Sequence, residues 1–245
     1  MLGRSTTLRC RVPIMPEIRY GRAMLSKLGG GALMASGALF LARDVLELAG
    51  GPPPAEGAAL LAWVESNRHL IAAGNELLFF ATIALVPAVV ALYRSLVTEH
   101  RATAVTGCGI IAAAIPILAV LAIVQGRLVY PVYGLRAGTP AAAELVVGIF
   151  HGALHAVGLM MAVATFVLSL AMRRGGYGRA IAYLGFVTSV LDLVGAYPYL
   201  IGTIPTLVCR VFFSAWFVAV GARLYRMRGL VEPSTNDRVE TERHT

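Results

Sequence analysis

Charged residues are scarce in this chain of 245 residues. Only 14% of them are Asp, Glu, Lys or Arg, whereas 58% are hydrophobic and the mean hydropathy is +0.73. Soluble domains average about 25% charged residues, so this composition excludes an ordinary soluble protein. The sequence therefore predicts an all-α integral membrane protein.

Signatures of metal, nucleotide and nucleic-acid binding are also absent. The three cysteines form no CxxC or Cys/His zinc spacing, and no phosphate-binding glycine loop, nucleophile elbow or dinucleotide fingerprint occurs. The net charge of +8 comes without a groove-reading motif or a basic stripe with interleaved aromatics. We therefore expect no nucleic-acid partner and interpret the basic residues as contacts to anionic membrane lipids.

Long apolar runs dominate the rest of the chain. A run of about 20 apolar residues can cross a bilayer as a helix. Six spans are predicted, which together make a transmembrane domain over residues 28–225: Leu28–Leu48, Leu70–Leu92, Ala102–Val124, Ala141–Met172, Arg179–Ile201 and Ile204–Tyr225. A basic segment, 1–27, precedes them, with Met15 and Met24 as alternative starts to Met1. The polar segment 226–245 lacks periodicity and is expected to be disordered.

The basic residues sort to one side of these spans. Most of the 21 Arg and Lys residues lie before the first span, in the loops that contain Arg94 and Arg173, or after the last span. Because Arg and Lys are retained on the cytoplasmic side, we expect both termini in the cytoplasm and a multi-pass protein of the cell membrane.

Five ionisable residues fall at a similar depth within the spans, in the outer half: Glu76, His151, His155, Asp192 and Arg210. A charged side chain near the bilayer centre costs roughly 3 kcal/mol on insertion scales, so such residues usually face a bundle interior or a wet cavity. The second, fourth, fifth and sixth spans are therefore predicted to enclose one polar site.

The histidines His151 and His155 are one helical turn apart and share a face. They are candidate ligands of a metal such as zinc, or candidate members of a proton relay, and hydrogen bonds to neighbouring helices are the structural alternative. Two histidines on one helix do not suit the axial ligation of a haem. The sequence assigns no cofactor.

The remaining polar residues have candidate roles in the same site. Glu76 and Asp192 are candidate general acids, because an apolar environment favours a protonated carboxyl. Arg210 is a candidate ligand for an anionic group, or the partner of one of these acids in an ion pair. Asn75 and Tyr197 are candidate hydrogen-bonding groups for a ligand.

Three further features concern packing around the site. Gly148, Gly152 and Ala156 form a small-residue stripe, which lets another backbone approach closely and predicts a helix seam or a homo-oligomer face. Residues 125–140 are expected to form a lid over the outer mouth. The stretch Ala55–Val64, with Trp63, is expected to lie along the outer interface.

Two stretches support a family resemblance. The segment His151–Tyr197, with its Arg173-Arg174-Gly175-Gly176 turn, and the segment Asn75–Leu96 resemble the small multi-pass membrane proteins of domain-of-unknown-function family 4386. The resemblance covers about half of the chain and implies a membrane bundle without implying an activity. The pair His151 and His155 also resembles the membrane zinc amidases that include alkaline ceramidases, but their third histidine and serine have no counterpart here.

Three classes of function remain open. The first is binding of, or acid–base chemistry on, a lipid-like or isoprenoid molecule in the buried polar site. The second is a proton- or ion-coupled transporter, although no inverted repeat or pair of broken helices is present in the sequence. The third is a structural or accessory membrane subunit whose buried charges hold helices together.

Overall fold

The computed structural model describes residues 16–227, with side chains from residue 24 onward. Most of the predicted basic segment and nearly all of the predicted disordered tail lie outside these residues. The helices are α1 (Pro16–Gly50), α2 (Gly57–Ser66), α3 (Arg68–Leu96), α4 (Arg101–Val129), α5 (Pro140–Arg174), α6 (Arg179–Gly195), α7 (Pro198–Ile201) and α8 (Thr203–Arg226). The described part contains no β-strand, which confirms the all-α class.

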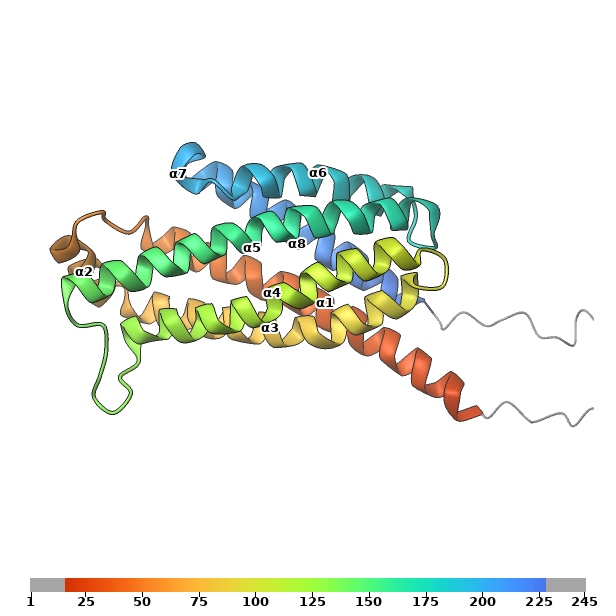
Figure 1. The fold of residues 1–245 in the computed structure, drawn as a ribbon, viewed down its shortest axis with the longest axis horizontal. Coiled ribbons are helices and arrows are strands. Elements are labelled where there is room, and N and C mark those ends of the chain that lie inside the picture. Colours follow the sequence, from red (N-terminus) through yellow and green to blue (C-terminus); the bar gives the residue numbers. More distant parts are fainter. Residues whose placement is uncertain (1–15, 228–245) are drawn as a thin grey trace, which may run out of the picture.

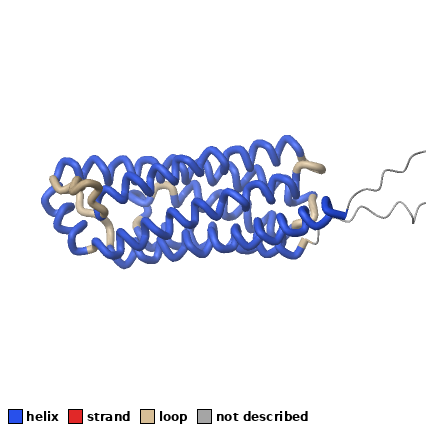
Figure 2. The backbone as a smooth tube through the Cα atoms, turned by 90° about the horizontal axis from the view of Figure 1, so that it is seen from below, coloured by secondary structure: helices blue, strands red, loops and turns tan. Residues whose placement is uncertain are grey.

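Six of these helices form a closed ring. Their axes run along the long dimension of the molecule (Figures 1 and 2). Contacts follow the order α1, α3, α4, α5, α6, α8 and then return from α8 to α1. The first and last described helices, α1 and α8, are therefore neighbours. The N-terminal end of α1 and the C-terminal end of α8 lie at the same end of the bundle (Figure 1).

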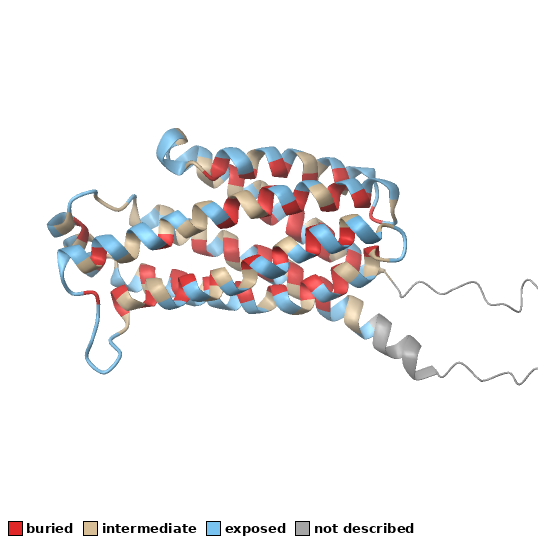
Figure 3. Ribbon diagram, viewed as in Figure 1, coloured by how far each residue is buried: buried red, intermediate tan, exposed pale blue. Residues whose placement is uncertain are grey.

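The surface of the bundle is apolar as well as its core. Buried leucines and aromatic residues fill the interior, while Phe80, Val120 and Ile123 are exposed on the outside, where buried and exposed positions alternate around each helix (Figure 3). Four helices in the described part are long and apolar enough to cross a membrane, namely α3, α4, α5 and α8. This is the surface of a membrane-embedded protein, since soluble proteins rarely expose large contiguous apolar patches.

The structure follows the second, third, fourth and sixth predicted spans closely. The start of α5 shows why: Thr139 is the N-cap, and its hydroxyl accepts a hydrogen bond from the Ala142 amide at 3.3 Å. Pro140 then occupies the first turn, where its missing N–H costs nothing. The first helix begins before its predicted span, because α1 already starts at Pro16.

The fifth predicted span, Arg179–Ile201, is wrong at its end. Helix α6 ends at Gly195 after 17 residues, and α7 begins at Pro198. Proline disfavours a helical conformation at the residue before it, and Tyr197 accordingly leaves the helical region with φ −112° and ψ 60°. The chain turns here into the short α7 and then into α8.

Close helix packing is concentrated at glycines other than those of the predicted stripe. At the crossing of α1 and α8, a Cβ atom added to Gly30 would lie 2.5 Å from the Tyr225 amide nitrogen. By contrast, a Cβ atom at Gly148 or Gly152 would meet nothing within 4 Å, and both glycines are exposed. The prediction that their stripe packs against another helix of the chain is wrong; its role as a homo-oligomer face stays a prediction.

The loop between α4 and α5 does not act as a lid on the cavity described below. It projects from the end of the bundle (Figure 1) as a turn closed by the bridge between Val132 and Leu135, and Tyr133 at its tip is 99% exposed. The ion pair between Arg136 and Glu65, at 2.7 Å, ties it to α2. Helix α2 itself covers most of the stretch predicted to lie along the interface.

Candidate functional site: a charged cavity at one end of the ring

A cavity of about 640 Å³ lies between α1, α5 and the corner formed by α7 and α8. We call it the charged cavity. Its ionisable lining residues are Arg43, Asp44, Glu47, His151, His155 and Arg210. Leu48, Leu154 and Leu207 supply apolar wall, so the cavity has a polar and an apolar part.

The early end of α6 creates the space for this cavity. Helix α5 has 35 residues and α6 only 17, so α5 continues well past the point where its neighbour stops (Figure 1). Gly152, Tyr199 and Thr203 line the cavity and are also exposed at the surface. The cavity therefore opens sideways, between α5 and the α7–α8 corner, where α6 would otherwise complete the wall.

Arg43 is the most heavily paired charge in the site. Its guanidinium lies 2.9 Å from Asp44 Oδ1 and 2.9 Å from Glu47 Oε2, and its Cζ lies 5.5 Å from the centre of the Phe150 ring. The Arg43 side chain is only 8% exposed, whereas that of Glu47 is 40% exposed. Two carboxylates and an aromatic face thus fix the guanidinium and satisfy its charge.

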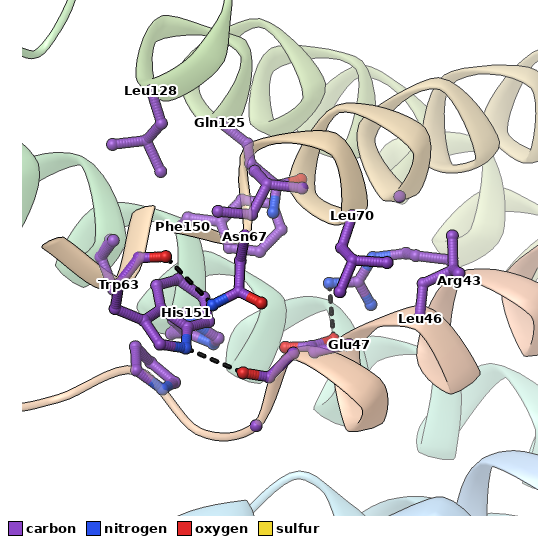
Figure 4. A pocket seen from close by; sticks show the side chains of 16 residues that line it. Arg43, Leu46, Glu47, Trp63, Asn67, Leu70, Gln125, Leu128, Phe150 and His151 are labelled. Carbon is purple, nitrogen blue, oxygen red and sulfur yellow. Dashed lines mark hydrogen bonds and ion pairs between the residues drawn. The ribbon is translucent and has the colours of Figure 1, made fainter. Parts of the chain in front are cut away.

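A smaller side cavity of about 50 Å³ lies on the other side of this cluster, toward α2, α3 and α4 (Figure 4). Arg43, Glu47 and His151 line both this side cavity and the charged cavity. The side cavity is closed in part by Trp63, whose indole N–H donates to the Gly50 carbonyl at 2.9 Å. The three ionisable residues therefore form the partition between two spaces.

His155 is held in one tautomer. Its Nδ1 lies 2.7 Å from the Ala196 carbonyl oxygen, and because a carbonyl oxygen only accepts, Nδ1 carries a proton; in the neutral ring, Nε2 is therefore the nitrogen with the lone pair. The Ala196 carbonyl is free for this bond because α6 has just ended, and terminal carbonyls lack helical partners. The ring of Tyr197 stacks edge-on against that of His155, with 4.7 Å between centroids.

Arg210 faces both the charged cavity and a second small space beside Phe40 and Phe213. The structure shows three ion pairs among the described residues, and none of them involves Arg210. The prediction of an ion pair between Arg210 and Asp192 or Glu76 is therefore wrong. Arg210 presents a cation to the cavity without a carboxylate bound to it.

Glu76, Asn75 and Asp192 lie outside the charged cavity. Glu76 is exposed on α3, where it accepts a hydrogen bond of 3.0 Å from the Tyr130 hydroxyl. Asn75 is buried on the same helix near Gly126 of α4. Asp192 is 2% exposed, and neither of its carboxylate oxygens has a hydrogen-bond partner among the described residues.

The structure therefore brings together three of the five ionisable residues expected in one site, namely His151, His155 and Arg210. The single site predicted for all five is wrong for Glu76 and Asp192, while catalytic roles for these two acids stay predictions. The predicted enclosing helices also change, because α3 contributes nothing to the charged cavity and α1 contributes three charged residues.

The α1 charges are hard to recognise as part of a site in the sequence, because they interrupt an apolar run near the end of the first predicted span. One signal was available in the sequence. Arg43 and Glu47 are four residues apart, which is the spacing of an ion pair on one helical face. An arginine that pairs with two acids of its own helical turn can remain buried in an apolar helix.

The described residues offer too few ligands for a zinc site. No group of three or more His, Cys, Asp or Glu side chains lies close enough together there to hold a metal ion. Catalytic zinc takes three protein ligands, and His151 and His155 supply two at most.

Comparison with known proteins found no family model, no curated protein and no solved structure that matches this chain.

Proposed function

We propose that all six helices of the ring span the membrane and that both ends of the described chain face the cytoplasm. Helices α1 and α6 complete the same ring as the four apolar helices. Arginines gather at the end where α1 begins and α8 ends, including Arg94, Arg173 and Arg226. Retention of arginine on the cytoplasmic side supports this orientation. Membership of family 4386 stays a proposal alongside it.

We further propose that the charged cavity binds a lipid-like molecule. The observation that carries this proposal is the sideways opening of the 640 Å³ cavity beside the truncated α6. Its volume falls within the range of about 300–1,000 Å³ that small-molecule sites occupy. In a membrane this opening faces the acyl chains, so an amphiphile can place its polar head inside and leave its tail among the lipids.

The lining supports a polar head in this position. Arg210 offers a cation that has no ion-pair partner within residues 24–227, and guanidinium groups bind carboxylate and phosphate oxygens through paired hydrogen bonds. The apolar wall contributed by Leu48, Leu154 and Leu207 suits the first part of a chain. Ionisable residues within membrane spans commonly mark substrate or ion pathways.

A mass-spectrometric measurement tests this proposal. Protein purified in a mild detergent is expected to carry a bound lipid-like molecule, whose occupancy falls about tenfold in Arg210→Gln because one charge-assisted contact is lost. Arg136→Gln is the control, since its ion pair with Glu65 lies on the exposed loop. A wild-type protein that carries no such molecule would overturn the proposal.

The opening itself can be tested with a matched pair of glycines. Gly152 and Gly148 are one turn apart on α5, both are exposed and both have open space around them, but only Gly152 lines the cavity. Gly152→Leu is therefore expected to lower lipid occupancy, and Gly148→Leu to leave it unchanged. Equal effects of the two substitutions would argue against this route of entry.

A second candidate function is proton transfer to or from the bound molecule. The fixed tautomer of His155, with Nε2 as a free proton acceptor, favours it. If this function is correct, membranes that contain the wild type should convert a lipid extract to a product of altered mass, and His155→Phe should abolish the conversion. Membranes with no conversion above the vector control would leave binding as the function of the site.

A further inference from the structure

The charges of the cavity separate into two poles. On α1, Arg43 carries one positive charge between two carboxylates, Asp44 and Glu47, each at 2.9 Å. With both carboxyls ionised, the α1 cluster has a net charge of −1. On α8, Arg210 carries a charge of +1 and forms no ion pair with either acid. The site as a whole is neutral when the histidines are neutral.

The negative pole has acceptor atoms available to a ligand. Arg43 contacts Oδ1 of Asp44 and Oε2 of Glu47. The second oxygen of each carboxylate has no hydrogen-bond partner among the described residues, and neither is sealed inside the protein. The Glu47 side chain is 40% exposed and the Arg43 side chain 8% exposed, so a molecule in the cavity meets the Glu47 carboxylate before it meets the guanidinium.

A simple ion does not suit these two poles. An anion bound by Arg210 would face the net negative charge of the α1 cluster, and a cation bound by Asp44 and Glu47 would face Arg210. A molecule with one charge of each sign satisfies both poles and leaves no uncompensated charge in a site of low dielectric constant.

We propose that the ligand of the charged cavity is a zwitterion, with its anionic phosphate or carboxylate on Arg210 and its amine on Asp44 and Glu47. This inference rests on the proposed function, and it narrows the lipid-like ligand to an amphiphile with an amino headgroup. His151 and His155 also line the cavity, and neutral imidazoles can donate to or accept from the polar atoms of the headgroup.

The test compares two lipids with identical acyl chains, phosphatidylethanolamine and phosphatidylglycerol, by native mass spectrometry of the purified full chain. Wild type is expected to bind the zwitterionic lipid about tenfold more tightly than the anionic one. Glu47→Gln should remove this preference while Asp44 still pairs with Arg43, and Arg210→Gln should weaken binding of both lipids. Glu65→Gln, which alters an exposed ion pair away from the cavity, should keep the wild-type preference.

Each outcome has a separate meaning. If wild type binds phosphatidylglycerol as tightly as phosphatidylethanolamine, or if Glu47→Gln retains the preference, the zwitterion proposal is overturned while lipid binding stands. If neither lipid binds, the proposed function is overturned. Glycerophosphoethanolamine, the headgroup without chains, is the third probe. If glycerophosphoethanolamine binds as tightly as phosphatidylethanolamine, the ligand is still a zwitterion, but it is a soluble molecule and not an amphiphile.

Discussion

Arg43 shows how a charge can be kept inside an apolar helix. The two acids that neutralise it come from its own helical turn, so the pairing does not depend on how α1 packs against its neighbours. The cost of burying an isolated charge is thereby reduced before the ring assembles. What remains exposed to the cavity is the acidic edge of the cluster.

Loss of Arg43 should consequently be far more damaging than loss of an exposed arginine. Arg43→Gln leaves Asp44 and Glu47 without their cation, and removal of one partner of a buried ion pair costs about 3 kcal/mol or more. Arg136→Gln breaks an exposed pair with Glu65, which is worth at most about 1 kcal/mol. Thermal unfolding of both variants in the same detergent checks this order, and a similar melting temperature for the two would contradict it.

Tyr177 provides a pH-dependent contact at the opposite end of the bundle. It lies between α5 and α6, is 3% exposed and shares a hydrogen bond with the Ser95 hydroxyl of α3. Burial raises the pKa of the Tyr177 phenol above its ordinary value. Its stabilising contribution is thus fully present below the unfolded pKa of about 10 and is lost as the pH rises toward the folded pKa.

Tyr177→Phe should therefore lower the free energy of unfolding by about 1 kcal/mol at pH 7. Ser95 keeps its bond to the Leu92 carbonyl at 2.7 Å, which limits the loss. Above about pH 10 the unfolded wild type ionises more readily than the folded protein, so the difference between wild type and variant should shrink. Chemical unfolding across this pH range measures the difference, and a constant gap would refute the role of Tyr177.

At the scale of elements, the crossing of α1 and α8 depends on the absence of a side chain. A Cβ atom at Gly30 would lie 2.6 Å from the Gly221 carbonyl oxygen and 2.5 Å from the Tyr225 amide nitrogen, both of which belong to the backbone. The neighbouring Gly31 has nothing within 4 Å of the same position. Adjacent residues of one helix thus provide a matched test of close packing.

Gly30→Ala is expected to destabilise the bundle by about 1–3 kcal/mol, because the backbone of α8 must move away. Gly31→Ala should be neutral or stabilising by up to about 1 kcal/mol, since alanine favours the helix more than glycine does. The melting temperatures of the two variants, each compared with that of the wild type, test this prediction. If both substitutions stabilise, the contact between α1 and α8 is looser than the structure indicates.

The sequence predicted where most helices lie, but it did not predict where each helix ends or which helices pack against each other. Apolar length was sufficient to find α3, α4, α5 and α8, but it could not reveal that Pro198 cuts the fifth span short. Nor could it reveal that α1 lies beside α8, because helices that are apolar on every face carry no periodic signal of which side meets a partner. In the site, His151, His155 and Arg210 could be found from their depth in the spans, whereas Arg43 could not, because it interrupts an apolar run near the end of its predicted span.

At the scale of the whole molecule, the proposed orientation can be checked by labelling. Tyr133 lies at the tip of the loop between α4 and α5, and Thr98 is exposed in the turn between α3 and α4 at the other end of the bundle. In a background without native cysteines, a membrane-impermeant maleimide should label Tyr133→Cys in intact cells. Thr98→Cys should react only after the membrane is permeabilised. The reverse pattern, or labelling of both sites in intact cells, would refute the orientation.

The closed ring also constrains the order of assembly. Helix α1 has α3 and α8 as its neighbours, and more than 150 residues of chain separate it from α8. During synthesis, the face of α1 that carries Gly30 lacks its partner until α8, the last helix of the ring, has been made. A nascent chain that stops before α8 has an open seam with the α1 charge cluster on its border. Such a chain lacks both the helix that covers the Gly30 face and Arg210, the cation that lines the cavity together with the α1 acids.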